Sequence, residues 1–232
     1  MTDFFSFSSQ EILVIWLTLK VALISTIVTL PFAVWISWIL SRKTIPGKTI
    51  IESIITLPLV APPVVTGYIL LILLGRNGII GKWFYESLGI SLSFNFAALV
   101  IASVIVSLPL AVRNIKSAFD LIDPVYEQAA RTLGASKIAT FFRVSIPLAL
   151  PGIISGMVLA FARCLGEFGA TITFAGNIHG KTQTIALLVY SNMQIPGKEL
   201  QVTRLVVVSI IISIAAIILS EYFNKRKRYL VR

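Results

Sequence analysis

The chain has 232 residues, of which 56% are hydrophobic and 13% are charged, and its mean hydropathy is +0.91. Soluble domains carry about 25% charged residues, so this composition excludes an ordinary soluble domain and indicates an integral membrane protein. The net charge of +10 does not indicate a nucleic-acid-binding protein, because the cations lie in short loops between apolar runs and do not form one basic face.

Five segments are long and apolar enough to cross a bilayer core of roughly 30 Å, which takes about 20 helical residues. They are residues 12–40, 49–74, 96–112, 148–165 and 205–223. None shows the alternation of a barrel strand, so we expect an all-α membrane protein with about five transmembrane helices. The first apolar run is too long for a signal-peptide core, and we expect the N-terminus to be retained.

Prolines interrupt two of these segments, Pro31 in the first and Pro58, Pro62 and Pro63 in the second. A proline within a helix removes a backbone hydrogen bond and kinks the axis. The stretch "LPLVAPPVVTGY" is therefore predicted to be a broken helix. Such a break either lies beside a water-filled cavity or is a bend that packing requires, and the sequence leaves both open.

Two connecting regions are not simple spans. Residues 75–95 mix glycine, aromatic and charged residues, as expected of a loop at the outer surface of the membrane. Residues 166–204 include the apolar piece "TIALLVYSNMQ", which is too short to cross a bilayer. We expect it to form an interfacial or re-entrant helix on the outer side.

The cations predict the orientation of the chain. The loop after the first span has three Lys and Arg, the loop after the third has five, and the C-terminal segment has five, against five in the two loops of the opposite side together. The positive-inside rule places the N-terminus outside and the C-terminus in the cytoplasm. Residues 10–223 are then a single transmembrane domain, and residues 224–232 are a basic cytoplasmic tail.

The segment "DPVYEQAARTLGASKIATFFRVSIPLALPG", residues 123–152, lies in a predicted cytoplasmic loop. Asp123 is expected to cap a helix that starts at Pro124, Gly134 to end it, and Ser136 to cap the next helix. Apolar residues recur at i, i+4 and i+8, namely at Val125, Ala129 and Leu133. A lipid-surface helix favours Lys, Arg, Trp and Phe, so this alanine-rich amphipathic helix is predicted to lie in a groove of another protein.

At these residues the chain resembles a known family. "EQAARTLGA" followed by "RVSIPLALPG" is similar to the EAA loop of type I ABC importer permeases, although Gln128 stands where the family has Glu and Glu127 precedes it. The resemblance implies a coupling loop at about 113–147 whose short helix docks in a separate ABC ATPase subunit. The residues expected to make that contact are Glu127, Gln128, Ala129, Ala130 and Gly134. The resemblance leaves open whether Glu127 or Gln128 takes the role of the family's glutamate.

The same resemblance implies the rest of the assembly. It comprises a homodimer of this chain, two copies of the ATPase and an external solute-binding protein, in the bacterial cytoplasmic (inner) membrane as a multi-pass protein. Two stretches, "LPLVAPPVVTGYILL" and "LAFARCLGEFGATITFAGNI", are similar to molybdate permeases of such importers. The resemblance implies import of molybdate, or of its chemical twin tungstate. Sulfate and thiosulfate permeases are similar around "ARCLGEFGA" but generally longer, and they are the alternative.

Charged residues within spans are costly and mark either buried pairs or substrate pathways. Arg163 and Glu167 are four residues apart and are expected to pair on one helical face. Lys20 either reaches out to the membrane surface or meets a partner helix. Gly169 and Thr171 of "EFGATIT" either allow close packing or contact an oxyanion. These five residues are the candidate substrate path.

The chain itself is not expected to be an enzyme. "AGNIHGKT" ends like a nucleotide-binding loop, but Ala175 occupies the position of the first glycine. ATP hydrolysis is therefore expected on the partner subunit. The single cysteine, Cys164, and the single histidine, His179, predict neither a metal site nor another cofactor. A membrane-embedded enzyme and a secondary transporter are alternatives, but the sequence has no catalytic constellation for the first and no inverted repeat for the second.

Overall fold

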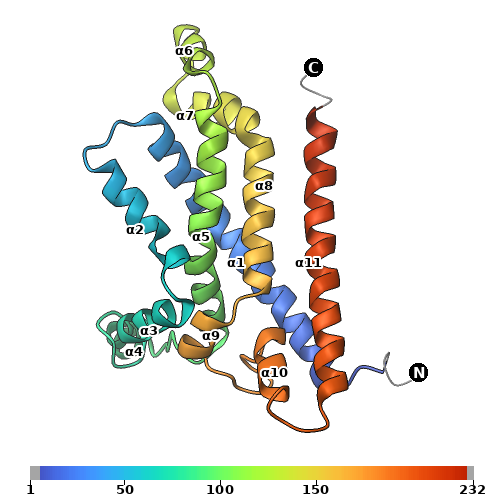
Figure 1. The fold of residues 1–232 in the computed structure, drawn as a ribbon. Coiled ribbons are helices and arrows are strands. Elements are labelled where there is room, and N and C mark those ends of the chain that lie inside the picture. Colours follow the sequence, from blue (N-terminus) through green and yellow to red (C-terminus); the bar gives the residue numbers. More distant parts are fainter. Residues whose placement is uncertain (1–5, 229–232) are drawn as a thin grey trace.

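The fold is a bundle of helices (Figure 1). A computed structural model describes residues 6–228, and the side chains of residues 6–218, and all regular elements in this part are helical. Four helices are long and apolar enough to cross a membrane, or five if one bent pair counts as a span. The spans are α1 (Ser9–Arg42), the bent pair α2 (Lys48–Val60) and α3 (Pro63–Leu74), α5 (Phe96–Asp120), α8 (Ile146–Leu165) with the short α7 before it, and α11 (Glu199–Arg228). The prediction of an all-α fold with about five spans is confirmed.

Helix α1 is longer than the membrane core is thick. Its 34 residues extend about 50 Å at 1.5 Å per residue, and the helix runs obliquely across α5 and α8 (Figure 1). It begins with a capping box, in which Glu11 N donates to Ser8 Oγ and Ser8 N donates to Glu11 Oε2. The helix continues through Pro31 without a break, so the predicted interruption there is wrong. A single proline removes only one hydrogen bond of a long helix, whose packing keeps it continuous.

The second predicted span is broken, as expected. Helices α2 and α3 meet at a bend of 111° around Ala61 and Pro62. A residue that precedes a proline is disfavoured in the α conformation. Because Pro62 and Pro63 are consecutive, this restriction falls on Ala61 and Pro62 in turn, and both are extended, with ψ of 145° and 129°. Pro58, which stands alone, lies within α2, so the interruption predicted there is wrong, as it is at Pro31.

Three spans extend well beyond their predicted ends. Helix α11 starts at Glu199, not at residue 205, and continues to Arg228, so the predicted tail is helical up to that residue. Helix α5 continues to Asp120, past the expected end at residue 112, because a helix does not stop where lipid stops and its charged last turns reach past the apolar core. The fourth span starts earlier than residue 148: α7 (Lys137–Thr140) passes through a π-helical turn, Phe141–Ser145, directly into α8.

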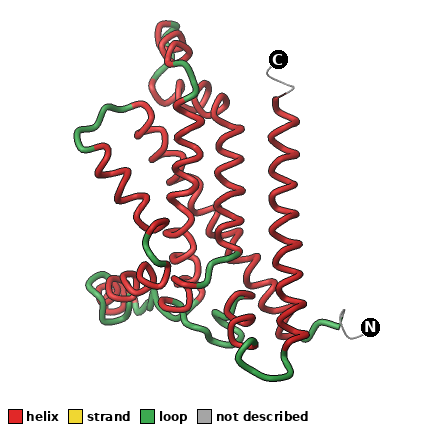
Figure 2. The backbone as a smooth tube through the Cα atoms, viewed as in Figure 1, coloured by secondary structure: helices red, strands yellow, loops and turns green. Residues whose placement is uncertain are grey.

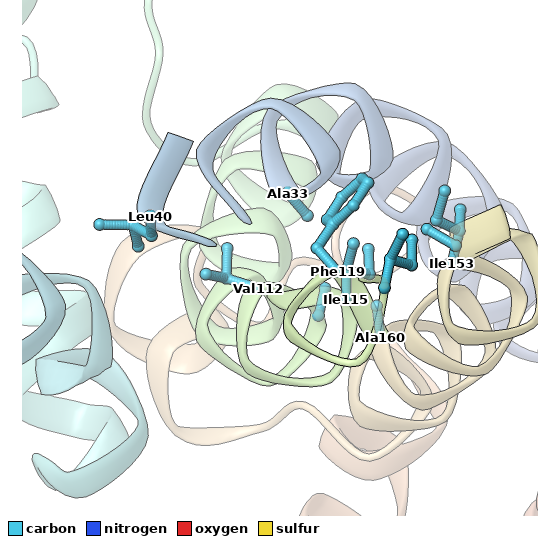
Figure 3. Packing of buried hydrophobic residues seen from close by; sticks show 10 residues of the cluster. Ala33, Leu40, Val112, Ile115, Phe119, Ile153 and Ala160 are labelled. Carbon is cyan, nitrogen blue, oxygen red and sulfur yellow. The ribbon is translucent and has the colours of Figure 1, made fainter. Parts of the chain in front are cut away.

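Small side chains hold α1, α5 and α8 close together. Ser37 Oγ donates to Val112 O of α5 at 2.9 Å, and Thr29 Oγ1 lies 3.3 Å from Ser107 Oγ. A Cβ added at Gly156 of α8 would lie 2.7 Å from Ile115 Cγ1, so these two helices need a glycine there. The apolar core lies at this three-helix contact, where Figure 3 shows Ala33 from α1, Val112, Ile115 and Phe119 from α5, and Ile153 and Ala160 from α8.

The loops gather at the two ends of the bundle (Figure 2). One end has α6 (Pro124–Thr132), the loop between α1 and α2, and the last turns of α11 (Figure 1). The opposite end has α4 (Gly81–Leu88), α9 (Gly169–Phe174) and α10 (Ile185–Asn192). Helix α10 is short and its apolar residues are buried there, consistent with the expected non-spanning helix. Residues 229–232 of the predicted basic tail lie outside the described residues.

Candidate functional site

The loop between α5 and α8 carries α6, which stands beyond the end of the bundle (Figure 1). Asp123 Oδ1 accepts a hydrogen bond from Val125 N at 2.9 Å, and Pro124 is the first helical residue. The helix ends two residues before Gly134, whose φ of +89° suits glycine best among the amino acids. Ser136 Oγ then accepts from Ala139 N at 3.2 Å and starts α7. The caps and the stop predicted from the sequence are confirmed.

The described chain leaves the apolar residues of this loop uncovered. Leu121 and Leu133 are each 88% exposed. Four further large apolar side chains here are also exposed, namely Val125, Tyr126, Ile138 and Phe142. Exposed apolar patches of this kind mark interaction sites, and we call these six residues the loop patch. The predicted contact residues Gln128 and Ala129 are exposed between them, and Ala130 is half-buried.

Glu127 lies on the opposite face of α6 and is buried. Its Oε1 accepts a hydrogen bond from Arg42 Nε at 3.0 Å and another from Ser145 Oγ at 2.8 Å. Arg42 Nη2 also donates to Ile122 O at 3.0 Å. The Glu127 carboxylate therefore joins α6 to the last turn of α1 and to the π-helical turn before α8. Of the two polar residues left open by the sequence, Gln128 is the one that faces outward.

The π-helical turn Phe141–Ser145 connects this junction to the bundle. The Phe141 ring packs edge-on against the Trp38 ring of α1, with centroids 5.1 Å apart. Extra-wide helical turns of this kind are rare and frequently occur at functional sites. A movement of α6 thus has two direct routes into the spans, one through Arg42 into α1 and one through Ser145 into α8.

Arg163 and Glu167 form the predicted ion pair, with Arg163 Nη1 2.8 Å from Glu167 Oε2. The Glu167 side chain is 2% exposed and that of Arg163 is 27% exposed. Glu167 lies just past the end of α8, and its Oε1 accepts from Ala170 N at 2.9 Å. The pair therefore holds the start of α9 against the end of α8.

The other residues of the candidate path lie at the same end of the bundle. Lys20 is exposed on α1, and its Nζ lies 5.1 Å from the centroid of the Phe96 ring. Gly169 allows α9 to meet α3, because a Cβ there would lie 2.6 Å from Pro63 Cβ. Thr171 is buried, and its hydroxyl donates to Phe168 O at 2.9 Å.

A buried ion pair at this end was missed by the sequence analysis. Arg204, in the second turn of α11, donates from Nε to Glu11 Oε1 and from Nη2 to Glu11 Oε2, both at 3.1 Å. Arg204 Nη1 also donates to Ser6 O. Both charged residues are at most 5% exposed. The pair joins the first turn of α1 to the start of α11.

Comparisons with known proteins identify the family. The family described as "Binding-protein-dependent transport system inner membrane component" matches residues 29–229. The Haemophilus influenzae "Molybdenum transport system permease protein ModB" is 50% identical over 217 residues, which cover 94% of this chain and 95% of that protein. The Synechocystis "Sulfate transport system permease protein CysW" is 35% identical over 210 residues, which cover 90% of this chain and 75% of that protein.

A solved structure agrees with the fold. A bacterial ABC transporter involved in the import of the acidic polysaccharide alginate contains a chain that superposes with a TM-score of 0.73 at 14% sequence identity. The match covers 95% of this chain and 80% of that one.

Proposed function

The chain belongs to the family of binding-protein-dependent transport system inner membrane components, and from this premise we propose that it is the transmembrane permease of an ATP-driven molybdate importer. The observation that carries the proposal is the 50% identity with a molybdenum permease along nearly the full length of both chains. Tungstate has the same charge and shape as molybdate, and we propose that the permease transports it as well.

In this proposal the permease acts as a homodimer with two ABC ATPase subunits and an external molybdate-binding protein. The loop patch around α6 is the surface that docks in the ATPase. Its support is the exposure of six large apolar side chains on a loop that stands beyond the bundle. Apolar surface of this extent requires a partner or a lipid layer. Helix α6 itself carries one cation, Arg131, whereas a lipid-surface helix is rich in Lys and Arg, so a protein partner is favoured.

The proposed orientation puts α6 in the cytoplasm and the start of α1 outside. Supporting it, the two cation-rich loops and the C-terminal half of α11 share one end of the bundle (Figure 1). Cytoplasmic ends of membrane helices are enriched in Lys and Arg. The external binding protein then delivers molybdate at the end that carries α4, α9 and α10.

Coupling follows from the junction at Glu127. When ATP draws the two ATPases together, each α6 moves with its ATPase and displaces α1 and α8 through Arg42 and Ser145. Gln128 and Ala129, which face outward, contact the ATPase, and Glu127 acts within the permease. The outer part of the substrate path lies beside Lys20 and the Arg163–Glu167 pair, with Gly169 and Thr171 setting the packing of α9.

Sulfate is the second candidate cargo, because the sulfate permease CysW is 35% identical to the chain. The two cargoes are separated by uptake of labelled molybdate in a strain that lacks its own molybdate importer and carries this permease with its ATPase and binding protein. We expect molybdate uptake that a tenfold excess of tungstate suppresses and that a tenfold excess of sulfate leaves largely intact. Stronger suppression by sulfate would assign the chain to sulfate import instead.

Gly134 provides a test of coupling. A side chain at φ +89° is strained by about 1–3 kcal/mol, so Gly134→Val should reshape the end of α6 and lower uptake per ATP hydrolysed several-fold. Gly197 is the matched control, because its φ is +83°, it also has open space around it, and it precedes α11 at the other end of the bundle. The measurement is molybdate uptake and ATP hydrolysis for both variants. Equal uptake per ATP in Gly134→Val and Gly197→Val would contradict the coupling role.

A further inference from the structure

A cavity of about 390 Å³ lies between α1, α2 and α5 at the end that carries α6. Its wall combines apolar residues of α1 and α5 with charged and hydroxyl residues, namely Glu52, Thr56, Arg113, Lys116 and Ser117. A second hollow, of about 400 Å³, continues along α2 and shares Glu52 and Thr56 with the first. The two together follow α2 from Thr49 to Val60.

Helix α2 presents a polar stripe to these hollows. Thr49, Glu52, Ser53 and Thr56 follow one another at i, i+3, i+4 and i+7, so they lie on one face of the helix. Its other faces carry exposed isoleucines and leucines. An ionisable side chain within a membrane helix faces a protein interior or a water-filled space, not lipid, and Glu52 lies in the middle of this stripe. The stripe therefore indicates water beside α2.

Three hydroxyl groups on this wall, those of Ser53, Thr56 and Ser117, have no proton to offer an anion. Ser53 Oγ donates to Thr49 O, Thr56 Oγ1 donates to Glu52 O, and Ser117 Oγ donates to Arg113 O. Each hydroxyl thus turns only its lone pairs to the cavity. Such oxygens accept hydrogen bonds from water and do not bind an oxyanion directly.

Lys116 is largely neutralised by two carboxylates. Its Nζ lies 2.9 Å from Asp120 Oδ2 and 3.6 Å from Glu52 Oε1. Glu52 Oε1 is buried and has no hydrogen-bond partner among the described residues. A buried carboxylate oxygen without a donor is a strong reason for water in the cavity beside it.

Arg113 is the free cation of the wall. Its side chain has neither an ion pair nor a hydrogen bond within the part of the chain that the structure describes. A guanidinium group has five N–H donors and stays charged, which suits a tetrahedral oxyanion with several acceptor oxygens. The other cation of the cavity wall, Lys116, is paired with Glu52 and Asp120 and so binds an anion weakly.

We infer that this polar cavity between α2 and α5 is the inner part of the translocation route, and that Arg113 is the group that contacts the oxyanion as it leaves toward the cytoplasm. The inference rests on the proposed function. A route must attract its ion enough for entry and bind it weakly enough for release. A hydrated wall with one unpaired guanidinium group meets both requirements.

The water-lined face is tested by cysteine labelling. In a Cys164→Ser background, the permease–ATPase complex in everted membrane vesicles is treated with a negatively charged, membrane-impermeant methanethiosulfonate. Thiols react as thiolates, which form in water and not in lipid, so Ser53→Cys and Thr56→Cys should react at least about tenfold faster than Ile54→Cys. Ile54 is the matched control, since it is the next residue to Ser53 and is 65% exposed on another face of α2. Equal reaction at Ser53→Cys and Ile54→Cys, or no reaction at any position, would overturn the route.

The role of Arg113 is tested by transport. Arg113→Gln should lower molybdate uptake about tenfold or more while ATP hydrolysis continues, and Arg113→Lys should keep much of the uptake because it retains the charge. Lys43→Gln, which removes an exposed cation from the neighbouring α1–α2 loop, is expected to leave uptake unchanged. Wild-type uptake in Arg113→Gln would overturn the inference and leave the proposed function intact. Absence of molybdate uptake in the wild-type complex would instead overturn the proposed function.

Discussion

Arg204→Ala is expected to destabilise the permease by about 3–5 kcal/mol, because it leaves the Glu11 carboxylate buried without its cation. Glu11 is 1% exposed and receives two hydrogen bonds from the guanidinium group, at 3.1 Å each. The same arginine ties down Ser6 O ahead of α1. Breaking the pair should lower the apparent melting temperature of the purified protein by about 6–20 °C.

The exposed pair of Lys82 and Glu86 is the control for this prediction. Its atoms are 3.8 Å apart and both side chains are more than 60% exposed, so Lys82→Ala should change stability by less than about 1 kcal/mol. The double variant Glu11→Gln with Arg204→Met removes both charges and should recover part of the loss, since no unpaired charge stays buried. If Arg204→Ala melts at the same temperature as Lys82→Ala, the pair does not hold α1 to α11.

Glu127→Gln is expected to uncouple transport from ATP hydrolysis. The amide keeps the size of the side chain, but it loses the charge that Arg42 Nε contacts at 3.0 Å. Hydrogen bonds to charged groups contribute about 1.5–3 kcal/mol, and 1.4 kcal/mol corresponds to a factor of ten. We therefore expect uptake per ATP hydrolysed to fall about tenfold or more in vesicles that contain the complete importer.

Two measurements distinguish coupling from simple loss of folding. The melting temperature reports the stability of Glu127→Gln, and the ratio of molybdate uptake to ATP hydrolysed reports the coupling. Glu86→Gln removes an exposed carboxylate of α4, at the opposite end of the bundle from α6, and is expected to change neither. A wild-type ratio in Glu127→Gln would show that the movement of α6 reaches the spans by another route.

Local signals in the sequence predicted the helical elements well. Hydrophobic length identified the spans, and the caps around α6 followed from Asp123, Pro124, Gly134 and Ser136, each of which acts within a few residues of its own position. The break between α2 and α3 followed from consecutive prolines for the same reason. The interruption predicted at Pro31 failed, because the outcome of one proline depends on how the helix packs.

The ends of the spans were less predictable. Hydrophobicity marks where lipid ends, but backbone hydrogen bonds continue the helix into water, as in the charged last turns of α5. Ser136 was expected to cap the next helix, yet nothing in the sequence distinguished the π-helical turn Phe141–Ser145 from an ordinary one. Such a turn differs by a single inserted residue in the hydrogen-bond pattern.

The two most informative ion pairs could not be predicted. Arg42 and Glu127 are 85 residues apart, and Glu11 and Arg204 are 193 apart, so only the assembled fold brings their charges together. The sequence analysis used Arg42 only as one of the cations that predict the orientation, whereas in the fold it also binds Glu127 of α6. The pair of Arg163 and Glu167 was predicted because its partners are four residues apart in the sequence, although α8 ends at Leu165 and Glu167 does not share its helical face.

The claim that a separate ATPase drives this permease is tested most directly by reconstitution. Liposomes that contain the chain with its ABC ATPase and the external binding protein are loaded with Mg-ATP, and the accumulation of labelled molybdate is measured. The account predicts uptake that stops when hydrolysis is blocked or when the ATPase is left out. Equal accumulation by the chain alone, without ATP, would contradict it.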